Sequence, residues 1–238
     1  DYLSEFWMTN QDRTYLESLT GDDGSKLFTK EFLDYLQNTP LECDVYAMPE
    51  GTITFPYEPI LRVEGPIIQA QLLETALLTL INFSTLTATK ASRIRKAAGD
   101  DPLLEFGLRR SHGIDGGITA SRAAMIGGCS ATSNVVAGKL FSVPVKGTHA
   151  HSLVMAFGDE IEAFAKYAEA MPHNSIMLVD TFDTIQGVRN AIKIGHKLRE
   201  MGSDLTGVRL DSGDLAELSI EARIILDEAG FEETKIVA

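Results

Sequence analysis

The pattern of apolar and polar positions changes character near residue 98. Before that point, short apolar runs at residues 44–48, 52–55 and 60–63 are separated by proline and glycine, which is typical of a small antiparallel sheet. The segment 67–98 that follows is apolar almost all round, so the pattern predicts a long helix buried between two layers. Residues 1–98 are therefore predicted to form a partial, mixed α+β domain.

From residue 99 onward, short apolar strands alternate with amphipathic helices. The predicted strands cover residues 103–108, 143–145, 176–179, 208–210 and 235–238. They recur at intervals of roughly 30–40 residues, the size of a βαβ unit, which predicts a parallel sheet that is doubly wound or closed into a barrel. Polar, glycine-rich segments follow these strands, where a β/α barrel has its catalytic face. Residues 99–238 are therefore predicted to be the first part of an α/β barrel that carries the active site.

Composition narrows the class of protein. Of the 238 residues, 44% are apolar and 23% are charged, as in ordinary globular proteins. The 21 Lys and Arg against 34 Asp and Glu give a net charge of −13, which opposes non-specific binding to nucleic acid or to an anionic membrane. Cys43 and Cys129 are too few for a disulfide framework or a cysteine-based zinc site, and they fit a reducing cytoplasm.

Targeting signals and the chain ends add two expectations. No uncharged apolar run approaches the roughly 20 residues of a membrane span, and no signal peptide is visible. The chain starts without methionine and stops within the predicted strand 235–238, so we interpret it as an internal fragment of a longer, cytoplasmic protein.

Two arginines follow the first predicted strand of the barrel. Arg109 and Arg110 leave segment 103–108 and enter segment 111–117, which its glycines predict to be a loop. Arginine binds carboxylate or phosphate through two parallel hydrogen bonds, and glycine lets backbone N–H groups approach an anion. The pair is therefore a candidate anion site, and a surface arginine pair beside a flexible turn is the alternative.

Two histidines follow the next predicted strand. His149 and His151 stand at positions i and i+2 after segment 143–145. An extended segment with this spacing holds two metal ligands, but no spacing rule supplies a third. Catalytic and structural roles for these histidines remain open at this point.

Carboxylates follow the next two strands. Asp183 and Asp214 stand where each caps the following helix. Asp180, Arg209 and Asp211 are harder to explain as caps, and a carboxylate at a strand end can orient a histidine or bind a sugar hydroxyl. Together these segments predict an enzyme for an anionic, phosphorylated substrate.

Several of these segments resemble the nicotinate phosphoribosyltransferase family. The matching stretches are residues 44–51, 105–110, 115–117, 147–151, 179–184 and 207–214. The resemblance implies the type II phosphoribosyltransferase fold, an α/β barrel with a small mixed domain. It implies transfer of a phosphoribosyl group from phosphoribosyl pyrophosphate to nicotinate, coupled to ATP hydrolysis, in NAD biosynthesis and salvage. Mg²⁺ and a homodimer are also implied.

The resemblance carries residue roles with it. It implies that His151 is the phosphorylated histidine, that Asp180 orients its ring, and that Asp211 binds ribose hydroxyls or magnesium-bound pyrophosphate. His149 receives no such role.

The substrate-binding set implied by the resemblance is larger. Arg109 and Arg209 would flank the pyridine carboxylate and the phosphates, while Phe106 would stack on the ring. Asn134 would favour nicotinate, because related nicotinamide-using enzymes have an aspartate near that position. The remaining members of the set are Thr148, Ser212 and Gly213.

Four other functions stay open. Two are close enzymatic relatives, the quinolinate and nicotinamide phosphoribosyltransferases. The other two are a non-catalytic barrel scaffold and a metal hydrolase built on His149 and His151.

Overall fold

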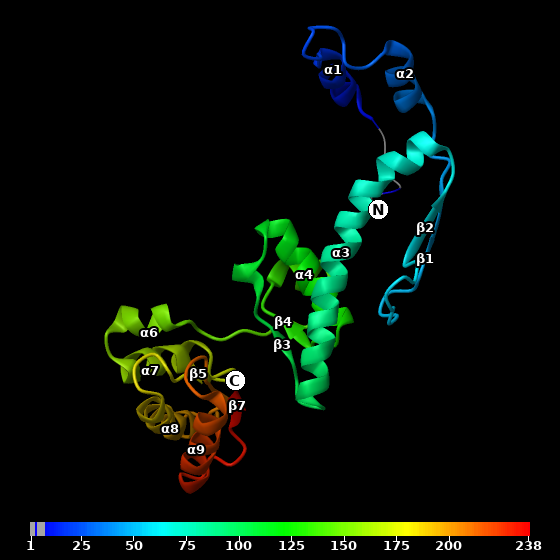
Figure 1. The fold of residues 1–238 in the computed structure, drawn as a ribbon. Coiled ribbons are helices and arrows are strands. Elements are labelled where there is room, and N and C mark those ends of the chain that lie inside the picture. The colour runs from blue at the N-terminus through cyan, green and yellow to red at the C-terminus, as the bar shows by residue number, and fades with distance from the viewer. Residues whose placement is uncertain (1–2, 4–7) are drawn as a thin grey trace. The chain divides into compact units, whose positions relative to one another are not determined.

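The computed structural model describes residue 3 and residues 8–238, and it divides them into two compact units (Figure 1). The units are Asp1–Val145 and Lys146–Ala238, whereas the sequence pattern placed the boundary at residues 98 and 99. The boundary lies further on because helix α3 (Ile67–Ala98) packs closely against helix α4 (Gly113–Ile126). A Cβ atom on Gly127 would lie 2.4 Å from the Ala88 carbonyl oxygen, so only glycine permits this approach.

The first unit combines helices with two small sheets. Strands β1 (Asp44–Ala47) and β2 (Leu61–Glu64) pair antiparallel, whereas β3 (Leu104–Glu105) and β4 (Ala131–Thr132) pair parallel. The expected middle run at 52–55 is not a strand, and the proline that follows it has no N–H for a ladder. Besides α3 and α4, the helices are α1 (Asn10–Ser18), α2 (Lys30–Asn38), the 3₁₀ helix η1 (Leu108–Arg110) and α5 (Val135–Phe141).

Helix α3 is less buried than its sequence predicts. Among its residues only Gln69, Leu73 and Ala91 are buried, and apolar side chains such as Leu86 are exposed. The predicted burial between two layers is therefore not provided by the residues described. Although the sequence led us to expect no membrane span, α3 meets the criteria of length and mean hydropathy for one. Core helices of soluble proteins meet the same criteria, so this is weak support for a membrane location.

The second unit is a run of βα units, as predicted. Its three strands are parallel, in the order β5 (Ile176–Leu178), β6 (Gly207–Arg209) and β7 (Lys235–Val237). Figure 1 shows α8 and α9 as the connections between successive strands. The helices are α6 (His151–Phe157), α7 (Glu160–Ala170), α8 (Thr184–Glu200) and α9 (Leu215–Glu228).

Three of the five strands predicted for the barrel are found where the pattern placed them. The other two are shorter than expected: segment 103–108 yields only β3, and segment 143–145 contributes a single bridge between Thr132 and Val145. Strand β4 was not predicted, because two residues are too few to show a period.

The core of the second unit fixes where its strands end. Val179 and Leu210 are buried among apolar residues of the helices, directly before Asp180 and Asp211. Helix α8 packs so tightly on the end of β5 that a Cβ on Gly187 would meet the Val179 carbonyl oxygen at 2.0 Å. Burial of the apolar residues thus presents the polar residues that follow at one edge of the sheet.

Candidate active site

The carboxylate of Asp180 connects the ends of strands β5 and β6. Its Oδ2 atom accepts a hydrogen bond from the Asp211 backbone N–H at 3.0 Å and another from the Ser212 hydroxyl at 2.6 Å. Its Oδ1 atom is buried and has no hydrogen-bond partner among the described residues. An unpaired buried carboxylate oxygen is costly, so a nearby donor would stabilise it.

His151 supplies the nearest candidate donor. It is the first residue of α6, and its side chain is 37% exposed. The Nδ1 atom lies 3.2 Å from the Thr181 hydroxyl and 3.9 Å from Asp180 Oδ1, while Nε2 lies 3.6 Å from Asp211 Oδ2. The ring therefore stands between two carboxylates, beyond hydrogen-bond distance of either.

Arg209 links two other residues of the same cluster. Its guanidinium donates to the Thr148 hydroxyl at 2.8 Å and forms an ion pair with Asp211 at 3.0 Å. Gly213 follows with a φ of 80°, a conformation that favours glycine in this turn. The structure thus brings together predicted residues of the second unit that come from three separate segments of the chain.

His149 does not share a metal site with His151. Its ring is buried, and its Nε2 atom already accepts a hydrogen bond from the Leu178 backbone N–H at 3.0 Å. Within the described part of the chain, no group of three or more His, Cys, Asp or Glu side chains is placed to hold a metal ion. The donor arrangement gives no support to the metal hydrolase considered from sequence.

In the first unit, Glu105 holds the turn that carries the predicted arginine. Its Oε1 atom accepts from the Gly107 N–H at 2.5 Å. Its Oε2 atom accepts from the hydroxyls of Thr132 at 2.6 Å and Ser121 at 3.1 Å. Sequence reasoning did not select Glu105 as a functional residue, because the pattern placed it inside the predicted strand 103–108, whereas β3 ends at Glu105.

The predicted ligand contacts of the first unit are partly available. Phe106 is half-buried, and Arg109 lies exposed in η1 without a hydrogen bond or ion pair to any described residue. The glycine-rich segment 111–117 was expected to be a loop, but α4 begins at Gly113. The apolar residues that follow favour a helix over an open anion loop, so this expectation is corrected.

Asn134 is engaged within the protein. It is 3% exposed, and its Oδ1 atom caps α5 by accepting from the Ala137 N–H at 3.2 Å. Its Nδ2 group donates to the Gly117 carbonyl at 3.3 Å and the Ser121 hydroxyl at 3.1 Å. These contacts account for the buried amide without a substrate, so no part of the function proposed below rests on Asn134.

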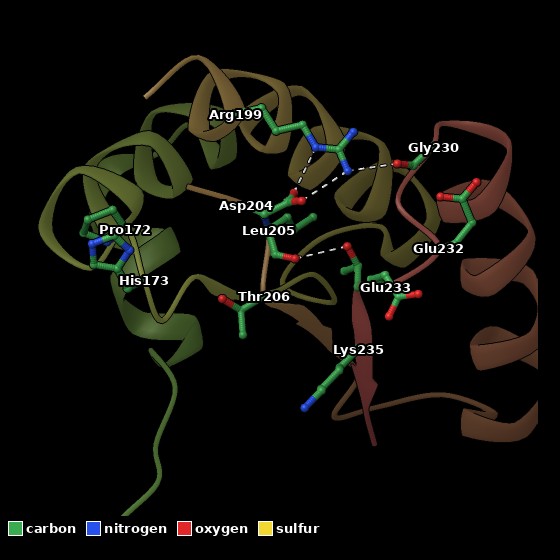
Figure 2. Close-up of a pocket in the computed structure, with 11 residues that line it drawn as sticks. Pro172, His173, Arg199, Asp204, Leu205, Thr206, Gly230, Glu232, Glu233 and Lys235 are labelled. Carbon is green, nitrogen blue, oxygen red and sulfur yellow. Dashed lines mark hydrogen bonds and ion pairs between the residues drawn. The ribbon is translucent and has the colours of Figure 1, made fainter. Parts of the chain in front are cut away.

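A separate pocket of about 400 Å³ lies at the opposite ends of the strands (Figure 2). Its residues precede or begin β5, β6 and β7, whereas ligands of parallel α/β folds bind beyond the carboxyl ends. Figure 2 shows Arg199 reaching Asp204 and the Gly230 carbonyl, at 3.0 and 2.9 Å. Its guanidinium also lies 3.8 Å from the centroid of the Phe231 ring. These contacts indicate a structural role for Arg199.

Comparisons with known proteins agree with this fold. A family model described as the nicotinate phosphoribosyltransferase N-terminal domain matches residues 1–82. A nicotinate phosphoribosyltransferase of Bacillus subtilis is 48% identical over 241 residues, covering 100% of this chain and 47% of the relative. The corresponding enzyme named pncB2 of Mycobacterium tuberculosis is 41% identical, covering 100% of this chain and 50% of the relative.

Solved structures of a nicotinate phosphoribosyltransferase and a related protein are similar to this chain as well. The human nicotinic acid phosphoribosyltransferase superposes with a TM-score of 0.85 at 34% identity, covering 99% of this chain and 57% of that chain. The nicotinate-nucleotide pyrophosphorylase of Pyrococcus furiosus superposes with a TM-score of 0.71 at 36% identity, covering 82% of this chain and 50% of that chain. The fold is therefore that of a type II phosphoribosyltransferase, as predicted. The chain is similar along its whole length to nicotinate phosphoribosyltransferases, and it spans about half the length of the curated relatives it matches.

Proposed function

We propose that the protein transfers a phosphoribosyl group from phosphoribosyl pyrophosphate to nicotinate, forming nicotinate mononucleotide and pyrophosphate for NAD biosynthesis and salvage. Similarity along the whole chain to proteins named for this reaction supports the proposal. The observation that carries it furthest is the cluster of His151, Asp180, Arg209 and Asp211 at the carboxyl ends of β5 and β6.

The residues suit the chemistry of phosphoribosyl transfer. The ribose develops positive charge as pyrophosphate leaves, so the protein must hold anions and hydroxyls in place. The side chain of Asp211 is 35% exposed, so its carboxylate is accessible for binding ribose hydroxyls or Mg²⁺. Mg²⁺ commonly binds one or two carboxylates together with substrate phosphates, where it neutralises the charge of the leaving group. Exposed Arg109 is suited to an anion, and Phe106 to stacking on the pyridine ring.

We further propose that ATP hydrolysis is coupled to the reaction through His151. A proton on Nδ1 is directed to the Thr181 hydroxyl and Asp180, which leaves the Nε2 lone pair free. Nε2 attacks the γ-phosphorus of ATP; an N–P bond forms, the P–O bond to ADP breaks, and ADP leaves with the electron pair. The added negative charge then reorganises the neighbouring substrate site for tighter binding. Water finally attacks the phosphorus, the N–P bond breaks with its electron pair returning to Nε2, and phosphate leaves, which completes the hydrolysis of ATP.

The substrate assignment is tested by incubating the purified protein with phosphoribosyl pyrophosphate, Mg²⁺ and ATP, together with nicotinate, nicotinamide or quinolinate. Mass spectrometry then measures the mononucleotide formed. We expect product from nicotinate and far less from the other two compounds. Equal use of nicotinate and nicotinamide would contradict the assignment, and preferential use of quinolinate would favour the alternative relative.

The coupling is tested with His151→Ala, which removes the proposed phosphoryl acceptor. We expect this variant to lose ATP hydrolysis and the gain in rate that ATP provides, but to retain slow ATP-independent transfer because the other ligand contacts remain. His173→Ala, at the opposite ends of the strands, is the control. Acid-labile label from γ-³²P ATP that persists on the His151→Ala protein would rule out His151 as the acceptor.

Two further parts of the proposal concern the setting of the reaction. We propose that the protein acts in the cytoplasm as a homodimer. Sedimentation of the purified protein tests the dimer, and fractionation of the source cells tests the location, with membrane recovery contradicting it.

A further inference from the structure

We propose that His149 is a positioning residue, which fastens the segment carrying His151 to the end of strand β5 and so sets the place of the phosphoryl acceptor. This inference rests on the proposed coupling through His151. It gives a role to a histidine that neither the sequence pattern nor the family resemblance had assigned one.

The side chain of His149 is enclosed on several sides. It is 8% exposed and packs against two aromatic rings of α7. The Tyr167 ring lies edge-on with its centroid 4.7 Å away, and the Phe164 ring lies at 5.8 Å. The ring therefore has a fixed place, and its hydrogen bond to the Leu178 N–H acts from that place.

The strand requires an acceptor at this point. Leu178 is the last residue of β5, which lies at the edge of the three-stranded sheet. The next amide along, that of Val179, is bonded to the Arg209 carbonyl, so the Leu178 N–H points away from β6. A buried N–H without an acceptor is costly, and the lone pair of His149 Nε2 supplies one.

The ring must be neutral to serve in this way, because a protonated imidazole has no lone pair to accept with. Burial lowers the pKa of His149, and the nearby positive charge of Arg209 lowers it further. The remaining ring nitrogen, Nδ1, then carries the proton and lies 3.5 Å from the Ala150 carbonyl.

The hydrogen bond joins the two segments whose spacing matters for the proposed reaction. His149 stands two residues before His151, and Leu178 stands two residues before Asp180. Losing the bond frees the loop to shift relative to the strand end. A displacement of about 1 Å at a reacting group costs on the order of 100-fold in rate.

The experiment compares three variants of the protein. His149→Phe keeps a ring but removes the acceptor, while His149→Gln places an amide oxygen near the position of Nε2. His173→Phe makes the same change at an exposed histidine beside the pocket of Figure 2. For each we measure thermal unfolding, hydrogen exchange at the Leu178 amide, the rate of histidine phosphorylation by ATP, and ATP-independent transfer.

We expect His149→Phe to remain folded, to exchange the Leu178 amide at least tenfold faster, and to phosphorylate His151 about 10- to 100-fold more slowly. ATP-independent transfer should change less than threefold. His149→Gln should restore most of the protection of the Leu178 amide and most of the rate of histidine phosphorylation. The control should match the wild type. If the phenylalanine variant does not fold, His149→Leu takes its place as a smaller side chain that likewise lacks an acceptor.

Two results overturn the inference. One is an unchanged rate of hydrogen exchange at the Leu178 amide in His149→Phe, which would show that the hydrogen bond from Leu178 to His149 does not protect this amide. The other is faster exchange with an unchanged rate of phosphorylation, which makes His149 a purely structural residue. A wild-type protein that is never phosphorylated contradicts the proposed coupling instead, so the two failures are distinguishable.

Discussion

Replacing Asp180 by asparagine tests whether the buried carboxylate controls the His151 ring. The substitution keeps the size of the side chain and removes its charge. In the wild-type protein, Oδ2 accepts from the Asp211 N–H and the Ser212 hydroxyl, while Oδ1 lies 3.9 Å from His151 Nδ1. The asparagine oxygen must take the place of Oδ2 because both partners there are donors, so the amide NH₂ turns toward the histidine.

Two magnitudes follow from that geometry. Hydrogen bonds to a charged group contribute about 1.5–3 kcal/mol and neutral ones about 0.5–1.5 kcal/mol, so weakening two of them costs about 2 kcal/mol. Removal of a buried charge offsets part of that cost, and we expect the free energy of unfolding to fall by about 1 kcal/mol. For the reaction, the new donor selects the tautomer with its proton on Nε2. The nucleophilic lone pair is then lost, and phosphorylation should fall on the order of 10²–10⁴-fold.

The assay is the initial rate of histidine phosphorylation by labelled ATP, measured beside urea unfolding. Asp183→Asn is the matched control, because Asp183 follows the same strand and caps α8 through the Gln186 N–H. Asparagine caps a helix about as well as aspartate, so this control should behave like the wild type. A rate within threefold of wild type in the folded Asp180→Asn protein would refute the control of the tautomer by Asp180.

Two further predictions concern charge elsewhere in the chain. Arg109→Lys keeps the positive charge but loses the planar guanidinium that can donate two parallel hydrogen bonds to an anion. We expect kcat/KM for nicotinate to fall about tenfold or more, equivalent to about 1.4 kcal/mol. Unchanged kinetics would show that Arg109 is a surface residue without a role in binding. Burial raises the pKa of Glu160, and the charges of Asp159 and Asp183 raise it further, against the hydrogen bond from Asn190. Ionisation of Glu160 therefore destabilises the folded protein increasingly as the pH rises from about 4.5 through the raised pKa. Glu160→Gln should for this reason raise the Tm, relative to the wild type, more at pH 8 than at pH 4.5. The same difference in Tm between variant and wild type at both pH values would contradict this prediction.

The sequence pattern located the strands of the second unit and the polar cluster at their carboxyl ends, although it placed the boundary between the units too early. Strands 176–179, 208–210 and 235–238 are apolar runs of the length of a buried strand, and parallel strands place their carboxyl ends at one edge. The pattern alone therefore predicts that Asp180 and Asp211 lie close together. The hydrogen bond from the Asp211 N–H to Asp180 reflects this adjacency.

The contacts that depend on side-chain direction could not be predicted in the same way. Glu105 and His149 matter through bonds to residues that are distant in sequence, such as Thr132 and Leu178, and no local period records them. Asn134 was given a substrate contact on resemblance, whereas its burial against α4 depends on how two helices pack. The segment 111–117 was expected to be a loop because of its glycines, but the apolar residues beyond it extend the helix back to Gly113.

The proposed phosphorylation of His151 would offset the free-energy cost of leaving a buried oxygen of Asp180 without a hydrogen-bond partner. In the resting protein this buried oxygen faces a ring that is too distant for a hydrogen bond. Phosphorylation at Nε2 leaves the proton on Nδ1, and the imidazole ring then carries more positive charge than before. A buried carboxylate attracts such a ring more strongly than a neutral one, so the distance to Nδ1 should shorten as the phosphoryl group is added. The electrostatic cost of Asp180 in the resting state thus becomes a stabilisation of the phosphorylated state, and Asp180→Asn removes both.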